Sequence, residues 1–151
     1  MNVAAYLARI GYIGPLDPAP ETLFGLHRAH LLAVPFENLD IALRRPILLD
    51  EGRFYHKIVE ERRGGFCYEL NGLFAALLRE LGFGVTLLSA RVLNGAGFGP
   101  EYDHLTLLVD AGGTDYLADV GFGDWFHEPL PLRAGESAQA RCVYQLARGG
   151  D

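Results

Sequence analysis

Cysteine is scarce in this sequence. The 151 residues include only two, Cys67 and Cys142. Two thiols are too few for a disulfide scaffold or for a four-cysteine zinc site, so we predict neither, and we expect no bound metal. Free thiols are typical of reducing compartments, and we therefore expect a cytoplasmic protein.

The sequence also lacks a long apolar run and an excess of positive charge. No hydrophobic segment approaches the roughly 20 residues of a membrane-spanning helix, and Arg9 interrupts the N-terminal stretch where a signal peptide would be apolar. The formal net charge is −6 and the pI is near 5.3, which argues against a nucleic-acid partner. We predict a globular protein that binds neither nucleic acid nor membranes.

Helical periodicity dominates the first 82 residues. Capping residues, prolines and glycines give the boundaries of the predicted helices. These helices run from a cap at Asn2 to Gly11, from Pro20 to a point before Pro35, from a cap at Asp50 to Gly64, and through Leu70, Phe74, Leu77 and Leu81 to Gly82.

After Gly82 the apolar residues alternate, which is typical of strands. The predicted strands are Val85–Asn94, His104–Val109, Tyr116–Val120 and Val143–Ala147, with a hairpin turn at Gly112 and Gly113. We predict an α+β protein with a helical bundle in residues 1–82 and an antiparallel β domain in residues 83–151.

The stretch RGGFCYELNG, residues 63–72, places Cys67 at the start of the fourth predicted helix. Free backbone N–H groups and the helix dipole favour a thiolate there, and Gly64 and Gly65 allow a tight turn that exposes the side chain. We interpret Cys67 as an accessible nucleophile; a buried structural cysteine is the alternative. Because Cys142 adjoins a predicted strand, we expect its thiol to be buried and unreactive.

A thiol nucleophile needs a base and a group that orients the base. Of the five histidines, His104 begins an apolar strand. If Gly112 and Gly113 form a two-residue turn, Thr106 faces Asp119, and His104 becomes a diagonal neighbour of Asp119 at about 7–8 Å. We therefore predict contact between His104 and Asp119, which a register slip of one residue would prevent.

The other histidines are expected to play lesser parts. His27 and His30 lie three residues apart on the second predicted helix. No third ligand is spaced to complete a metal site, so we expect both at the surface or at a boundary. We expect His56 to be solvated, and His127 to be exposed or to line a cleft.

Four segments occur in a characteristic order along the chain. They are VPFENLD (Val34–Asp40), RGGFCYELN, EYDHLTLLVD and LADVGFGDWF. Together they resemble the arylamine N-acetyltransferase family. The resemblance implies a Cys67–His104–Asp119 triad. It also implies a helical bundle followed by an antiparallel β-barrel, here incomplete, with a catalytic core like that of transglutaminases and papain-like cysteine proteases.

The resemblance implies roles for six further residues near the triad. They are the supporting ion pair of Glu37 and Arg63, the acceptor-pocket aromatics Phe36 and Phe122, and the glycines Gly121 and Gly123 of the loop near the acyl donor.

The resemblance also implies a reaction. Cys67 would take an acetyl group from acetyl-CoA, release coenzyme A, and pass the acetyl group to an aromatic amine or hydrazine. Two alternatives remain open, namely another thiol acyltransferase, amide synthase or hydrolase on the same core, and an inactive truncated form. The second arises because family members continue into a lid domain beyond the point that matches Asp151, so we expect marginal stability and an exposed strand edge.

Overall fold

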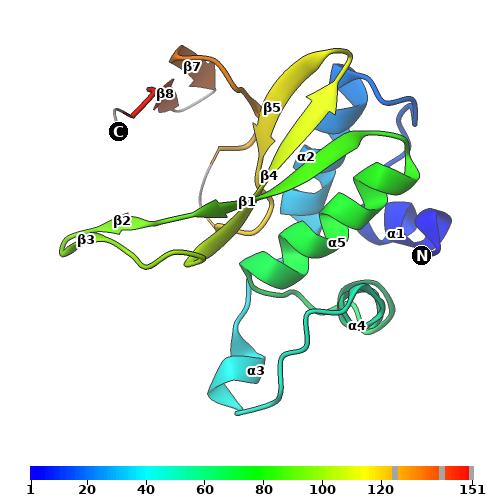
Figure 1. Ribbon diagram of the computed structural model, residues 1–151. Coiled ribbons are helices and arrows are strands. Elements are labelled where there is room, and N and C mark those ends of the chain that lie inside the picture. The colour runs from blue at the N-terminus through cyan, green and yellow to red at the C-terminus, as the bar shows by residue number, and fades with distance from the viewer. Residues whose placement is uncertain (124–125, 140–141, 150–151) are drawn as a thin grey trace.

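Figure 1 shows the computed structural model of the protein, which describes residues 1–123, 126–139 and 142–149. The helices are α1 (Val3–Ile10), α2 (Pro20–Ala33), α3 (Leu39–Ala42), α4 (Glu51–Tyr55), the π-helical turn η1 (His56–Glu60) and α5 (Cys67–Glu80). Among the helices described, none combines the length and the apolar character that crossing a membrane requires.

The predicted helix boundaries are largely confirmed, because local chemistry sets them. The side chain of Asn2 accepts a hydrogen bond from the Ala5 N–H at 3.1 Å, and Gly11 ends α1 with a left-handed φ of 68°. Pro20 begins α2. The third predicted helix is α4 continued by η1. Helix α3 was not predicted, because its four residues are too few to show a periodicity.

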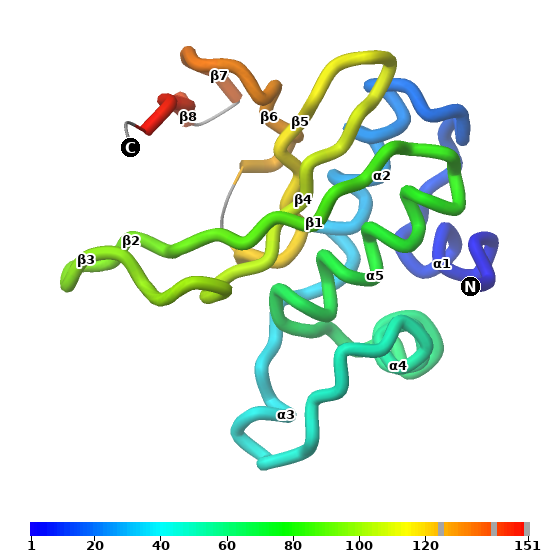
Figure 2. The backbone as a smooth tube through the Cα atoms, in the orientation of Figure 1, coloured from blue at the N-terminus to red at the C-terminus, as the bar shows by residue number. Residues whose placement is uncertain are grey.

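The strands form three separate antiparallel sheets. The largest has the order β1-β4-β5-β6, and β2 pairs with β3, and β7 with β8. Their bounds are β1 Gly84–Ala90, β2 Leu93–Asn94, β3 Gly97–Phe98, β4 His104–Ala111, β5 Thr114–Ala118, β6 Leu130–Pro131, β7 Gly135–Gln139 and β8 Cys142–Leu146. Figure 2 shows the β2–β3 and β7–β8 hairpins lying away from the helices.

The predicted α+β class with antiparallel sheets is confirmed. In the described part of the chain no closed barrel forms, and the sheets of the predicted incomplete barrel stay separate. Strands β3, β6 and β7 were also not predicted. The predicted strand Val143–Ala147 corresponds to β8, and its partner is β7, which precedes it. The pattern of β7 and β8 shows why they were difficult to find: each is mostly exposed and has no buried apolar face.

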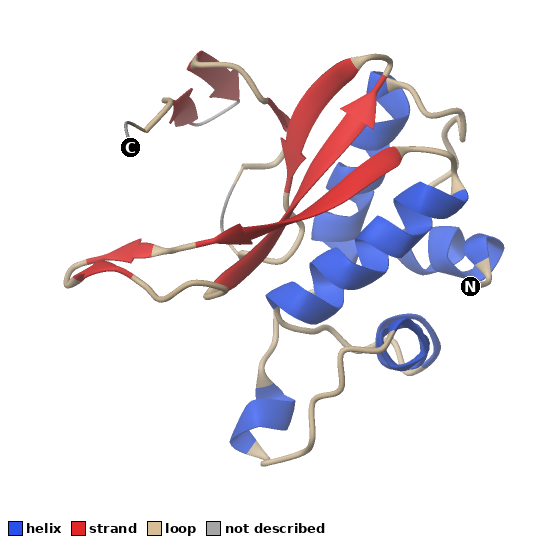
Figure 3. Ribbon diagram, in the orientation of Figure 1, coloured by secondary structure: helices blue, strands red, loops and turns tan. Residues whose placement is uncertain are grey.

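The hydrophobic core lies between α5 and the largest sheet. Figure 3 shows α1, α2 and α5 gathered on one side of that sheet. On α5, Leu73, Phe74 and Leu77 are fully buried, as are Leu107 and Val109 on β4. One hydrophobic cluster thus contains residues from both sides of residue 82. The division into two domains at that residue stays a prediction.

Candidate active site

Cys67 is the first residue of α5, and a short pairing of distant segments fixes this end of the helix. Phe36 forms a parallel bridge with Gly65, and the Glu37 N–H donates to the Gly65 carbonyl at 2.8 Å. A Cβ at Gly64 would lie 2.0 Å from the Pro35 carbonyl oxygen, so only glycine permits this approach. The VPFENLD and RGGFCYELN segments are therefore joined through their backbones.

The structure corrects the expected exposure of both thiols. Cys67 is buried, with 8% of its surface exposed, whereas Cys142 is exposed on the edge of β8. The cause at Cys67 is the loop that contains Gly121. A Cβ on Gly121 would lie 2.8 Å from the Cys67 Cα, so the loop crosses directly over the start of α5.

His104 and Asp119 meet as the hairpin register predicted. Ala111 pairs with Thr114, which confirms the two-residue turn. The Nε2 of His104 lies 2.5 Å from Oδ2 of Asp119, and both side chains are buried. With Nε2 bound to the carboxylate, Nδ1 is the nitrogen left for the thiol of Cys67.

Burial and the contacts with Asp119 and Cys67 determine the pKa of His104. Burial on its own lowers the pKa of His104, but hydrogen bonds to Asp119 and Cys67 outweigh it and raise the pKa to about 9. The imidazolium is therefore the stable form near neutral pH. In general, an imidazolium beside a thiol favours the thiolate, which is the form of a thiol that attacks carbonyl carbon.

Asn71 completes the polar core of the site, and sequence reasoning did not single it out. It lies one turn beyond Cys67 on α5. Its Nδ2 donates to Oδ1 of Asp119 at 2.9 Å and to the Leu105 carbonyl at 2.7 Å, and its Oδ1 accepts from the Val120 N–H at 2.8 Å. A lone amide four residues after the cysteine, on an otherwise apolar helix face, was the signal available in the sequence.

The loop of Gly121, Phe122 and Gly123 brings some of the predicted substrate residues to His104 and Asp119. The ring of Phe122 packs edge-on against His104, with 5.1 Å between centroids. Gly121 donates its N–H to Oδ1 of Asp119 at 2.9 Å, and Gly123 has a left-handed φ of 93°. Phe36 lies beside Gly65 in the bridge described above, and its ring is 46% exposed.

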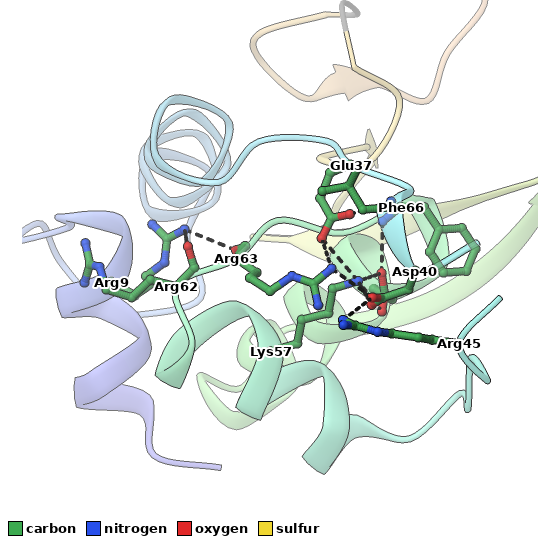
Figure 4. A network of polar contacts seen from close by, with 10 residues as sticks. Arg9, Glu37, Asp40, Arg45, Lys57, Arg62, Arg63 and Phe66 are labelled. Carbon is green, nitrogen blue, oxygen red and sulfur yellow. Dashed lines mark hydrogen bonds and ion pairs between the residues drawn. The ribbon is translucent and has the colours of Figure 1, made fainter. Parts of the chain in front are cut away.

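The predicted contact between Glu37 and Arg63 is present, within a larger ionic network (Figure 4). Arg63 lies 2.7 Å from Glu37 and 3.0 Å from Asp40. Lys57, on η1, lies 2.9 Å from Asp40 and 2.7 Å from Glu69. The hydrogen bond from Lys57 is the main cause that lowers the pKa of Asp40 to about 2, against the opposing effect of burial.

This network supports the start of α5. Glu69 accepts a hydrogen bond from the Phe66 N–H at 3.1 Å, which caps the helix next to Cys67. Arg9 on α1 also supports this region. Its guanidinium donates hydrogen bonds to four backbone carbonyls, those of Ile58, Ala33, Arg62 and Arg63. Sequence reasoning found Glu37 and Arg63 but missed Lys57, Asp40, Glu69 and Arg9.

The expected surface position of His27 and His30 is wrong, since both are fully buried. They lie on the face of α2 that packs against Phe74 of α5. His56 is solvated, as predicted, and lies 2.6 Å from Glu60. His127 is exposed. In the part of the chain that the structure describes, no group of three His, Cys, Asp or Glu side chains is arranged to hold a metal ion.

Comparisons with known proteins identify relatives of this chain. The N-acetyltransferase family model matches residues 20–151. The arylamine N-acetyltransferase / N-hydroxyarylamine O-acetyltransferase of Salmonella typhimurium is 47% identical over 150 residues, which cover 97% of this chain and 53% of that protein. Proansamycin X synthase of Amycolatopsis mediterranei is 37% identical over 150 residues, which cover 96% of this chain and 58% of that protein.

A solved structure has a similar fold. The arylamine N-acetyltransferase of Mycobacterium marinum in complex with CoA superposes with a TM-score of 0.92 at 39% identity, over 99% of this chain and 58% of that one. The chain thus spans about half the length of the relatives it matches. Because the family model covers most of the sequence, the chain belongs to the arylamine N-acetyltransferase family.

Proposed function

We propose that this chain carries the acetyl-transfer centre of an arylamine N-acetyltransferase, with Cys67 as nucleophile, His104 as acid and base, and Asp119 as the group that orients His104. The buried contact of 2.5 Å between His104 and Asp119, next to the helix end that bears Cys67, is the observation that carries the proposal. We infer the same arrangement of helix-borne cysteine and strand-borne histidine as in papain-like and transglutaminase cores.

The first half of the proposed reaction loads the enzyme. The Cys67 thiolate attacks the thioester carbonyl carbon of acetyl-CoA, and backbone N–H groups at the start of α5 stabilise the oxyanion. The bond between that carbon and the sulfur of coenzyme A breaks. Coenzyme A leaves as a thiol with the proton of the His104 imidazolium, and Cys67 becomes an acetyl thioester.

The second half passes the acetyl group on. The nitrogen of an aromatic amine or hydrazine attacks the acetyl carbon while His104 accepts its proton. Cys67 leaves as a thiolate, and the thiolate–imidazolium pair is restored. We assign Phe36 and Phe122 to the acceptor site, because an aromatic ring packs well against aromatic side chains. We assign Gly121 and Gly123 to the loop beside the acyl donor.

Intact mass spectrometry after incubation with acetyl-CoA tests the proposal. We expect one added acetyl group, which peptide mapping places on Cys67, and its loss when an aromatic hydrazine is added. Cys142→Ser should acetylate normally, and Cys67→Ser should not acetylate. Acetylation at Cys142 alone, or none in the wild-type chain, would reject the proposed function.

A synthase, such as an amide synthase, is the second candidate, because the relatives of this chain include proansamycin X synthase. Such an enzyme would form the same kind of thioester at Cys67 but from another acyl donor. Rapid acetylation of Cys67 by acetyl-CoA distinguishes the two. A chain that is alkylated at Cys67 with the pH profile of an ion-paired thiolate, yet is not acetylated, would favour the synthase.

A further inference from the structure

The backbone around Asp119 needs support from side chains, because the β-ladder ends one residue earlier. The last pair between β4 and β5 is Leu107 with Ala118. Thr106 donates to the Ala118 carbonyl at 3.1 Å, and Asn71 accepts from the Val120 N–H at 2.8 Å. Between these two positions, the backbone of Asp119 is contacted by His27.

Both ring nitrogens of His27 contact backbone groups of this region. Nδ1 lies 3.1 Å from the His127 carbonyl oxygen, and Nε2 lies 3.2 Å from the Asp119 nitrogen and 3.0 Å from the Asp119 carbonyl oxygen. Because a carbonyl only accepts, Nδ1 carries a hydrogen. Nε2 then accepts from the Asp119 N–H when the ring is neutral, or donates to the Asp119 carbonyl when it is protonated.

The surroundings of His27 favour the neutral ring and hold it still. Burial lowers the pKa of His27 to about 4, although the bonds to His127 and Asp119 oppose the effect. Phe126 stacks on the imidazole with 10° between planes, and Phe74 contacts it edge-on. A ring fixed by packing is well suited to hold another group in place.

We propose that His27 is a positioning residue, which fixes the backbone of Asp119 so that its carboxylate meets His104 at the distance that activates Cys67. This inference rests on the proposed function. The same ring also contacts the His127 carbonyl, so one side chain holds the backbone at two points, Asp119 and His127. Gly121 and Phe122 lie between these two points, one above Cys67 and the other against His104.

His30 provides a matched control on the same helix. It is also fully buried and also contacts Phe74, but its Nδ1 pairs with the Tyr6 hydroxyl at 2.8 Å. In the described residues its Nε2 has no hydrogen-bond partner. Substitution at His30 therefore disturbs the core to a similar degree without touching Asp119.

The test uses the 151-residue chain with Cys142→Ser, and measures iodoacetamide alkylation of Cys67 from pH 5 to 10 together with thermal unfolding. His27→Phe keeps an aromatic ring at this position but loses the hydrogen bonds to Asp119 and to His127. We expect its alkylation rate at pH 7 to fall about tenfold or more, with a profile shifted toward that of an ordinary thiol. His27→Gln places an amide within reach of Asp119 and should stay within about threefold of the parent rate.

His30→Phe should unfold at a lower temperature yet keep the parent pH profile. If His27→Phe does not fold, His27→Asn replaces it, because the shorter amide reaches His127 and not Asp119. We expect the same fall in the alkylation rate of Cys67. A folded His27→Phe or His27→Asn with the parent pH profile would overturn the inference. The inference would also be overturned if the alkylation rate of Cys67 fell equally in His27→Gln and His27→Phe and followed only the melting temperature of each variant. A parent chain with this profile that acetyl-CoA fails to acetylate would reject the proposed function and leave the role of His27 standing.

Discussion

Replacing the carboxylate of Asp119 by an amide should invert the tautomer of His104. In the native site Oδ1 of Asp119 accepts hydrogen bonds from Asn71 and from the Gly121 N–H, both at 2.9 Å. Both partners are donors, so in Asp119→Asn the amide oxygen must occupy this position. The amide NH₂ is then turned toward Nε2 of His104, which has to accept. The ring proton moves to Nδ1, where it blocks acceptance of the proton from Cys67.

The size of the effect follows from the protonation of His104. Burial alone lowers the pKa of His104, and the bonds to Asp119 and Cys67 raise it to about 9. Relative to the ordinary value, this favours the imidazolium by about 3 kcal/mol. If Asp119 supplies half of that, its loss lowers the equilibrium constant for proton transfer from Cys67 to His104 about tenfold. The wrong tautomer adds to this, and in a serine-protease triad the same change costs about 10⁴-fold in kcat.

Two measurements separate the tautomer from a general loss of structure. The rate of Cys67 alkylation at pH 7 should fall about tenfold or more, and acetylation by acetyl-CoA about 10³-fold or more. Circular dichroism should remain that of the parent chain, since the shape of the side chain is conserved. A folded Asp119→Asn variant that alkylates and acetylates at parental rates would refute the reasoning. Asp115→Asn, on the exposed end of the same hairpin, is the control and should change neither rate.

The remaining predictions concern the loop, the ionic network and pH. Gly121→Ala should lower the Cys67 acetylation rate about tenfold or more, because the new Cβ would lie 2.8 Å from the Cys67 Cα and displace the loop. Lys57→Met leaves the buried carboxylate of Glu69 without its cation, and urea unfolding should show a loss of about 3–5 kcal/mol in the free energy of unfolding. The exposed control Glu60→Gln should lose less than about 0.5 kcal/mol. The raised pKa of His104 contributes stability that is complete below about pH 6.5 and is lost as the pH rises through about 9, so melting temperature should fall over that range, and less so in His104→Gln.

Local chemistry made much of the fold predictable. The cap at Asn2, the proline at the start of α2 and the glycine after α1 act within a few residues of themselves. The glycine pair after Ala111 fixed a turn, the turn fixed the register, and the register brought His104 to Asp119. A single local feature was thus enough to predict a contact across fifteen residues.

The burial of some polar side chains could not be predicted from the sequence, because it depends on partners from distant segments. His27 was expected at the surface or at a boundary because no third ligand is spaced to complete a metal site with it. Its hydrogen bonds are instead to residues 92 and 100 positions away. Lys57 is buried for a similar reason, since Asp40 and Glu69 neutralise its charge from two other elements. No periodicity in the neighbourhood of either residue reveals such partners.

The burial of Cys67 has a further consequence for the proposed mechanism. Its place at the helix end predicted an exposed thiol, because local geometry says nothing of the Gly121 loop that covers it. An acyl thioester open to solvent would be lost to hydrolysis between the two halves of a ping-pong reaction. A thioester with Phe122 and the Gly121 loop packed around it is shielded from water until an amine arrives. On this mechanism the cover over Cys67 directs the acetyl group to an amine rather than to water, and the helix dipole and His104 favour the thiolate without exposure to solvent.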